Sequence, residues 1–154
     1  MTTFLLLRHA HSVANKAGIL AGQLEGIGLS NDGIAQVNKL TSSFENLKID
    51  RIISSPMQRC LETVEGIAKS KKKRISIDKR LIEMNYGSWS GKKLSKGLDN
   101  FQKFAVDPCS LTTLSWGSKS RMLLTFNQKI VSIKSSKKKK RRDGNTLGGS
   151  KDVA

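Results

Sequence analysis

The 154-residue sequence contains little histidine, cysteine or proline, and it lacks long hydrophobic runs. Its two cysteines, Cys60 and Cys109, lie far apart without metal-ligand spacing, which argues against a disulfide framework or a zinc site. The first apolar run is too short for a signal peptide, and no stretch has the length of a transmembrane helix. We therefore expect a cytoplasmic protein with reduced thiols, no membrane contact, and neither a metal nor another cofactor.

Acidic residues are also scarce, and this gives the chain a formal charge of +16. Residues 1–96 hold 16 Lys and Arg against 8 Asp and Glu, whereas residues 97–154 hold 12 against 4. So large a positive charge favours anionic partners, among them phosphorylated small molecules, nucleic acid and acidic surfaces. The length suits one domain with a hydrophobic core.

Short apolar runs alternate with helical patterns over the first half of the chain. Apolar runs predict strands, and apolar residues at steps of three and four predict amphipathic helices. The predicted order is a strand at 3–9, a loop at 16–29, a helix after Ser30, a strand at 49–53, a helix that opens at Ser55-Pro56, and a strand at 75–77. We expect Ser30 and Ser55 as N-caps. The alternation is typical of an α/β fold with a mainly parallel sheet covered by helices.

The pattern weakens after residue 96, and residues 81–91 read as a structured loop. We divide the chain into a patterned region at 1–96, a partly folded region at 97–133 and a basic disordered tail at 134–154. Within the middle region, 122–133 is apolar enough for a strand or a short helix. The tail block Lys137–Arg142 lacks interleaved aromatics for base stacking. We expect weak, non-specific, salt-dependent contact with nucleic acid at most.

A charged edge follows the first predicted strand, where Arg8 and His9 end the apolar run Phe4–Leu7. In open α/β sheets, ligands bind just outside the carboxyl ends of strands. A guanidinium there can grip an anion, and an imidazole can act as a nucleophile or a base. A phosphoryl-transfer site without a metal also needs an acid for the leaving group, which Glu83 can supply. Taken singly, each of these residues is more often structural than functional.

Four blocks in the first 91 residues make a more specific pattern together. They are the segments 7–15, 29–33, 54–63 and 81–91, which read LRHAHSVAN, LSNDG, SSPMQRCLET and LIEMNYGSWSG. In order and spacing they resemble the motifs of the histidine phosphatase superfamily. The resemblance implies a phosphoglycerate mutase-like fold, which is a three-layer α/β sandwich, and a phosphorylated small molecule as substrate.

The resemblance also implies a role for each matching residue. His9 is the nucleophile that becomes phosphorylated, and Glu83 is the proton donor. The phosphate-binding residues are Arg8, Asn15 and Arg59, and the weaker matches Gly22 and Gln23 lie where the family shapes its substrate-side loop. His11 matches no catalytic position and is expected to be incidental.

One family feature is missing from the sequence. The second catalytic histidine of the family follows a late strand, but no histidine follows His11 in this chain. We therefore expect a fold that is incomplete toward the C-terminus and a phosphatase with impaired activity. Two other functions remain open, a phosphate-binding remnant without catalysis and a phosphomutase. The change in composition near residue 96 suggests the hypothesis of an altered reading frame beyond that point.

Overall fold

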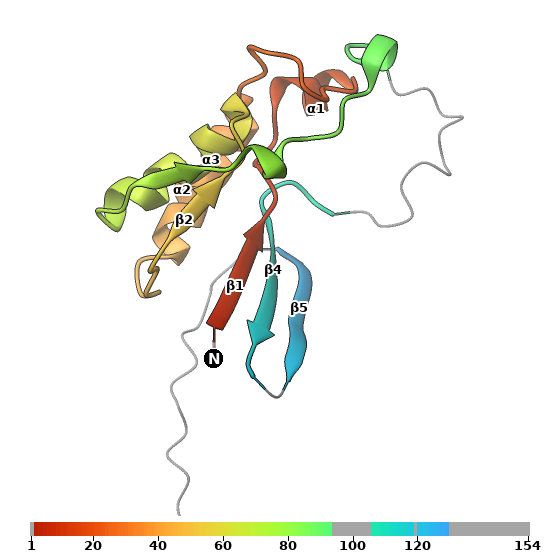
Figure 1. The fold of residues 1–154 in the computed structure, drawn as a ribbon. Helices are drawn as coiled ribbons and strands as arrows, with labels where there is room; N and C mark the ends of the chain where they lie inside the picture. The colour runs from red at the N-terminus through yellow and green to blue at the C-terminus, as the bar shows by residue number, and fades with distance from the viewer. Residues whose placement is uncertain (1, 94–105, 119, 130–154) are drawn as a thin grey trace, which may run out of the picture.

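The computed structural model of the protein describes residues 2–93, 106–118 and 120–129 (Figure 1). The predicted basic tail at 134–154 lies outside these residues. In chain order the elements are β1 (Thr2–Leu7), α1 (Val13–Ala17), α2 (Asn31–Ser43), β2 (Ile52–Ser54), α3 (Gln58–Ser70), β3 (Ile75–Ile77), the 3-10 helices η1 (Lys79–Leu81) and η2 (Gly87–Trp89), β4 (Ser110–Trp116) and β5 (Arg121–Lys129). None of the described helices is both long and apolar enough to cross a membrane.

The strands form two small sheets. One has the order β1-β4-β5 with antiparallel pairing throughout, and the other joins β2 and β3 in parallel. A mainly parallel sheet is therefore not confirmed. The cause is the β4–β5 hairpin, whose short turn allows only antiparallel pairing, and which lies along one edge of β1. Within the described part of the chain, no hydrogen-bonded strand connects β1 to β2.

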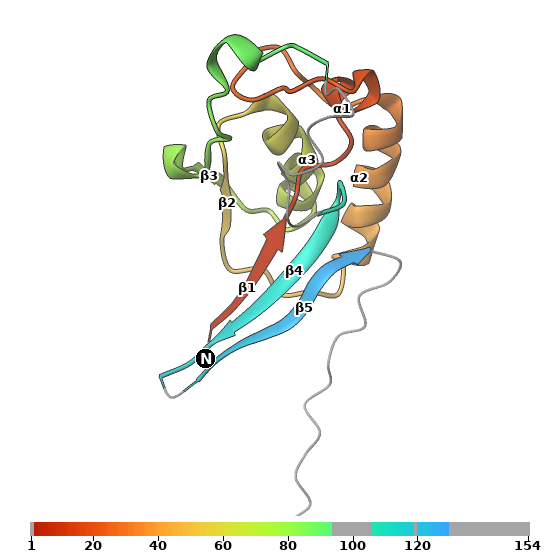
Figure 2. The ribbon, with the colours of Figure 1, turned by 90° about the vertical axis from the view of Figure 1, so that its right-hand side faces the viewer.

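Helices α2 and α3 pack against each other beside the strands (Figure 1, Figure 2). The buried core cluster joins them to both sheets and consists of Ala10, Leu40, Phe44, Ile52, Ile67, Ala68, Cys109 and Leu111. Leu5 and Leu7 of β1 pack against this cluster, whereas Phe4 and Leu6 of the same strand are exposed. The described residues thus build a layer of helices on one face of the strands. The expected third layer is not among them.

The start of α2 confirms the prediction from the sequence. Ser30 is its N-cap, and the Ser30 hydroxyl accepts a hydrogen bond from the amide of Gly33 at 3.2 Å. The prediction for α3 was wrong by two residues, because its N-cap is Met57 and not Ser55. The Ser55 hydroxyl instead accepts from the Met57 amide at 3.4 Å, within the turn that leaves β2.

The five-residue helix α1 was not predicted from the sequence. A capping box explains why so short a helix forms directly after the end of β1. The Ser12 hydroxyl accepts from the Asn15 amide, and the Asn15 side chain accepts from the Ser12 amide. Gly18 ends the helix in the left-handed conformation, with φ of 64°.

Candidate functional site

His9 lies just beyond the carboxyl end of β1. Its Nδ1 lies 2.8 Å from the carbonyl oxygen of Ala10. A carbonyl oxygen can only accept, so Nδ1 carries the proton and Nε2 of the neutral ring keeps its lone pair. Burial lowers the pKa of His9, and the charges of Arg59 and Arg8 lower it further. The Ala10 carbonyl and Glu83 raise this pKa, but they do not cancel the lowering. The ring is therefore biased toward the neutral form, in which Nε2 is a nucleophile.

Arg59 has an unusual environment for a buried cation. The residue is 1% exposed, and its Nη2 donates to the carbonyl of Gly22 at 2.8 Å. Its Nε and Nη1 are buried without a hydrogen-bond partner. Unpaired donors in a protein interior are costly, and most are satisfied by a protein group, a water or an ion. A phosphate oxyanion is a suitable acceptor, because its ionised oxygens form charge-assisted hydrogen bonds with a guanidinium.

Thr63 connects the segment of His9 to the helix of Arg59. The amide of Ala10 donates to the Thr63 hydroxyl at 3.0 Å, and this hydroxyl donates to the carbonyl of Arg59 at 2.6 Å. The chain directly after His9 is thereby fixed against the first turn of α3. No role was predicted for Thr63, although its place four residues after Arg59 puts it on the same helix face.

Arg8 is held by the segment that leads into β4. Its backbone amide donates to Ser110, and its Nη1 donates to the carbonyl of Val106. The amide of Cys109 donates to the carbonyl of His9 at 3.1 Å. Residues 106–110, which are distant in the sequence, therefore hold both Arg8 and His9 in place through hydrogen bonds. The charge of Arg8 also contributes to the lowering of the His9 pKa.

Asn15 takes part in the capping box of α1. Its Oδ1 accepts from the Ser12 amide at 3.0 Å and from the Ser12 hydroxyl at 2.9 Å. These bonds occupy the side-chain oxygen, which could not bind an anion in any case. The Nδ2 group, which can donate to an anion, takes no part in them. Within the described part of the chain, the side-chain hydrogen bonds of Asn15 go to Ser12 and not to Arg8 or Arg59.

The loop residues Gly22 and Gln23 contact two predicted site residues. Gly22 presents its carbonyl to Arg59, while the Gln23 side-chain amide donates to the carbonyl of Glu83 at 2.7 Å. Gly22 has a φ of 47°, and a Cβ there would lie 2.8 Å from the ring of Tyr86. A residue with a side chain would not fit this position. The two loop residues thus contact Arg59 and Glu83, and their contact with substrate stays a prediction.

Tyr86 is a site residue that the sequence analysis missed. Its hydroxyl donates to Oε1 of Glu83 at 3.4 Å, and its ring lies against Gly22. Burial and the nearby Glu83 carboxylate raise the pKa of Tyr86. Its spacing of three residues from Glu83, inside the glycine-rich block, was the available signal. Tyr86 therefore links the predicted acid to the loop that holds Arg59.

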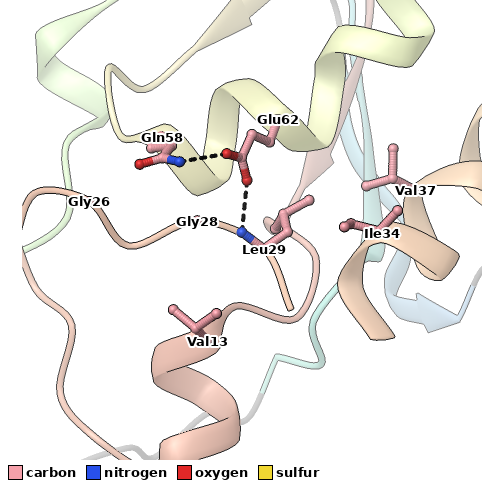
Figure 3. Close-up of a pocket in the computed structure, with 8 residues that line it drawn as sticks. All are labelled: Val13, Gly26, Gly28, Leu29, Ile34, Val37, Gln58 and Glu62. Carbon is pink, nitrogen blue, oxygen red and sulfur yellow. Dashed lines mark hydrogen bonds between the residues drawn. The ribbon is translucent and has the colours of Figure 1, made fainter. Parts of the chain in front are cut away.

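One hollow in the structure lies apart from these residues (Figure 3). It has a volume of about 460 Å³ and is lined by Val13, Gly26, Gly28, Leu29, Ile34, Val37, Gln58 and Glu62. The Glu62 carboxylate accepts from the Leu29 amide and from the Gln58 side chain, both at 2.7 Å. These bonds tie the loop at 26–29 to α3. Of the described residues, no three His, Cys, Asp or Glu side chains form a group that could hold a metal ion.

Two curated proteins related to this chain are named as enzymes of phosphate compounds. Phosphoserine phosphatase 1 of Hydrogenobacter thermophilus is 31% identical over 112 residues, which are 70% of this chain and 53% of that protein. The 2,3-bisphosphoglycerate-dependent phosphoglycerate mutase of Thermoplasma acidophilum is 31% identical over 62% of this chain and 48% of its own length. The chain spans about half the length of the curated relatives it matches.

Solved structures share the α/β fold of this chain. The native mycobacterial glucosyl-3-phosphoglycerate phosphatase matches with a TM-score of 0.54 and 26% identity, over 58% of this chain and 42% of that one. The complex of the same enzyme with VO3 matches with a TM-score of 0.74 and 14% identity, over 83% of this chain and 100% of that one. Residues 4–99 also match the family described as the histidine phosphatase superfamily (branch 1). This match covers more than half of the sequence, and the chain belongs to that superfamily.

Proposed function

We propose that this chain binds a phosphomonoester through Arg8, Arg59 and Asn15 and hydrolyses it through a phosphohistidine on His9. The observation that carries the proposal is the guanidinium of Arg59, which is buried with two unpaired donors and close enough to depress the pKa of His9. An anion that accepts from Arg59 would also be attracted to Arg8, whose charge likewise reaches His9. The relatives named phosphatase and mutase support a phosphorylated small molecule as substrate.

The proposed reaction has two steps. In the first, Nε2 of His9 attacks phosphorus, the ester P–O bond breaks, and the leaving alkoxide takes a proton from Glu83. In the second, water attacks the phosphohistidine, gives a proton back to the Glu83 carboxylate, and the P–N bond breaks. Inorganic phosphate leaves, and His9 returns to its neutral form. The Nδ1 hydrogen bond to Ala10 keeps the attacking nitrogen unprotonated throughout.

The rate of this reaction is expected to be low. The family resemblance calls for a second histidine at the phosphate, and the chain has none after His11. Loss of one donor from a preorganised oxyanion site costs about 2.7–4 kcal/mol, or roughly 10²–10³ in rate. Hydrolysis is favoured over mutase activity, because a mutase must keep a phosphorylated intermediate enclosed while its substrate reorients. A cytoplasmic location fits such a substrate and is part of the proposal.

The test is to incubate the full chain with radiolabelled phosphoserine and to quench the reaction in alkali, which preserves phosphohistidine. We expect label on the wild-type chain and none on His9→Asn. The variant Glu83→Gln should label more slowly with phosphoserine, whose alkoxide needs a proton, than with p-nitrophenyl phosphate, whose leaving group does not. Equal labelling of the wild type and His9→Asn would refute the proposed nucleophile.

A second function is supported by the missing histidine. Without it, the chain would keep the anion site and lose turnover. Such a remnant would bind inorganic phosphate or vanadate, which would raise its melting temperature, yet it would never become labelled. A chain that is neither stabilised nor labelled would contradict both functions.

Binding of nucleic acid remains a prediction for the block Lys137–Arg142, which lies outside the described residues. The described run Lys71–Arg74 follows the end of α3, where Lys71 donates to the carbonyl of Glu45 at 2.6 Å. Any such binding should weaken steeply with salt, because it would rest on phosphate contacts alone.

A further inference from the structure

The hollow in Figure 3 lies between three helices and one loop. Val13 of α1 forms one wall, and Ile34 and Val37 of α2 form another. The loop side holds a leucine and two glycines, while Gln58 and Glu62 of α3 form a polar end. We call this hollow the Glu62 pocket. At about 460 Å³ it falls within the usual range of small-molecule sites, which is roughly 300–1,000 Å³.

The walls of the Glu62 pocket are apolar and open to solvent. Val13 is 45% exposed and Ile34 is 51% exposed, although both side chains are hydrophobic. They belong to different helices, and both line the pocket. Removal of apolar surface from water is favourable, so these side chains would stabilise a ligand with an apolar body.

The polar end of the pocket is a carboxylate with unused hydrogen-bonding capacity. Glu62 accepts one hydrogen bond on each oxygen, from the Leu29 amide and from the Gln58 side chain, both at 2.7 Å. A carboxylate offers about four lone-pair sites, so each oxygen can accept again. Both donors are neutral amides, and none of the ion pairs among the described residues includes Glu62. The negative charge at this end of the pocket therefore has no cationic partner there.

The carboxylate of Glu62 is already held in place in the free protein. Its bonds to Leu29 and Gln58 fix its orientation toward the loop. The loop packs closely here, since a Cβ on Gly28 would lie 2.9 Å from Nε2 of Gln58 and 3.1 Å from the Glu62 oxygens. A side chain at position 28 would push both groups out of place. A ligand would thus meet an ordered acceptor, which lowers the entropy cost of binding.

We propose that the Glu62 pocket binds a small organic cation, in which a primary ammonium is carried on an apolar body. The ammonium would donate to the Glu62 oxygens, and the apolar body would pack on Val13, Ile34 and Val37. An anionic ligand would be repelled by the carboxylate, and a neutral one would leave its charge unpaired. His9 does not line this pocket, and the proposal does not depend on whether His9 becomes phosphorylated.

The experiment compares two probes of similar size. Phenethylamine is an ammonium ion at neutral pH, and phenethyl alcohol is uncharged. Each is titrated into the full chain at constant ionic strength, and NMR follows the methyl groups of Val13, Leu29, Ile34 and Val37. We expect saturable shifts with phenethylamine and a Kd on the order of 1 mM. The alcohol should bind about tenfold more weakly, because it lacks the charge-assisted hydrogen bond.

A matched pair of variants tests the role of the carboxylate. Glu62→Gln and Glu65→Gln each remove one negative charge from α3, but Glu65 is paired with Lys69 at 2.8 Å and does not line the pocket. Glu62→Gln keeps an acceptor for the Leu29 amide and should bind phenethylamine about tenfold more weakly. Its affinity for the alcohol should change little. Glu65→Gln should bind both probes like the wild type.

A second pair of variants tests the location. Ile34 and Ile77 are both 51% exposed, but only Ile34 lines the pocket, whereas Ile77 belongs to β3. Ile34→Lys introduces an ammonium that competes for the pocket and should weaken binding of phenethylamine by about tenfold or more. Ile77→Lys should bind it like the wild type. Circular dichroism and urea unfolding check that all variants fold.

Three results would overturn the proposal. Equal affinity of the wild type for phenethylamine and the alcohol would mean that charge does not select the ligand. Equal weakening by the two variants of either pair would place the binding outside the Glu62 pocket. Failure of the wild type to bind phenethylamine would show that the pocket accepts no cation of this class, for example because a lysine or arginine side chain of the same chain already fills it.

Discussion

Replacement of Arg59 by methionine should separate anion binding from stability. In the free protein, the guanidinium has one hydrogen bond, from Nη2 to Gly22, and two buried donors without partners. A hydrogen bond to a charged group contributes about 1.5–3 kcal/mol, and each unsatisfied buried donor costs about 1–3 kcal/mol. The loss of the Gly22 bond is therefore offset by removal of the two unpaired donors. We expect Arg59→Met to be as stable as the wild type, or more stable, without phosphate.

Phosphate should reverse this order. A charge-assisted hydrogen bond from the guanidinium corresponds to about 1.5–3 kcal/mol, or roughly 10–10² in phosphate affinity. At a phosphate concentration of 100 times Kd, the wild type should gain about 2.7 kcal/mol in the free energy of unfolding, and Arg59→Met about 1.4 kcal/mol or less. Urea unfolding with and without phosphate, at constant ionic strength, measures both quantities. His9→Asn is the control, because it removes the nucleophile and keeps the guanidinium.

Two outcomes would refute the reasoning about Arg59. If Arg59→Met without phosphate were less stable than the wild type by more than about 3 kcal/mol, the unpaired donors would not carry the cost assigned to them. If both proteins gained equally from phosphate, the anion would bind elsewhere, for example at the lysines that follow α3.

Three further predictions concern the surroundings of this guanidinium. Because the pKa of His9 is lowered in the folded protein, the unfolded chain binds a proton at a higher pH than the folded chain does. The free energy of unfolding of the wild type should therefore fall as the pH drops below about 6.5. In His9→Gln this fall should be smaller, and urea unfolding at several pH values measures both. Thr63→Val leaves the buried amide of Ala10 without an acceptor and should lower the free energy of unfolding by about 1–3 kcal/mol. The control Thr41→Val removes only a hydrogen bond within α2 and should lower it less. Equal losses of stability would show that Thr63 does not connect the two segments. Gly22→Ala and Gly18→Ala both strain a left-handed backbone, but only Gly22→Ala adds a clash with an aromatic ring. Thermal unfolding should therefore show a larger loss of stability for Gly22→Ala, which should also bind phosphate more weakly. A larger loss of stability for Gly18→Ala would argue against the packing of Gly22 on Tyr86.

Local signals in the sequence predicted local structure well. Ser30 and the apolar steps after it predicted α2, and the isoleucines at 75 and 77 predicted β3. The helix α1 was not predicted, because five residues are too few to show a periodic pattern. Its stability rests on the Ser12–Asn15 capping box. The N-cap of α3 was misplaced because Ser55-Pro56 carries the usual signature of a helix start, yet the helix begins only after Met57.

Long-range pairing accounts for the larger errors. Residues 2–7 pair with residues 111–116, and no pattern within either segment specifies that partner. The composition after residue 96 predicted only partial folding at 97–133 and no partner for it, and the structure places β4 and β5 beside β1, with the Cys109 amide donating to the His9 carbonyl. Strand pairing depends on which edges are free once the helices have packed, and this is a property of the whole chain.

In the candidate site, too, local features were predicted from the sequence and long-range contacts were not. The chemical groups, an imidazole, two guanidiniums and a carboxylate, were predicted from short blocks, since each block carries its residue regardless of context. The positioning contacts were not predicted, because they join segments distant in sequence, such as Gly22 with Arg59 and Thr63 with Ala10. Those contacts decide whether the groups can work, since they fix a cation in the interior with two donors open. A remnant that had lost its use for anions would be stabilised by replacing so costly a residue. The buried Arg59 with its two unpaired donors therefore supports the proposal that this chain binds phosphate.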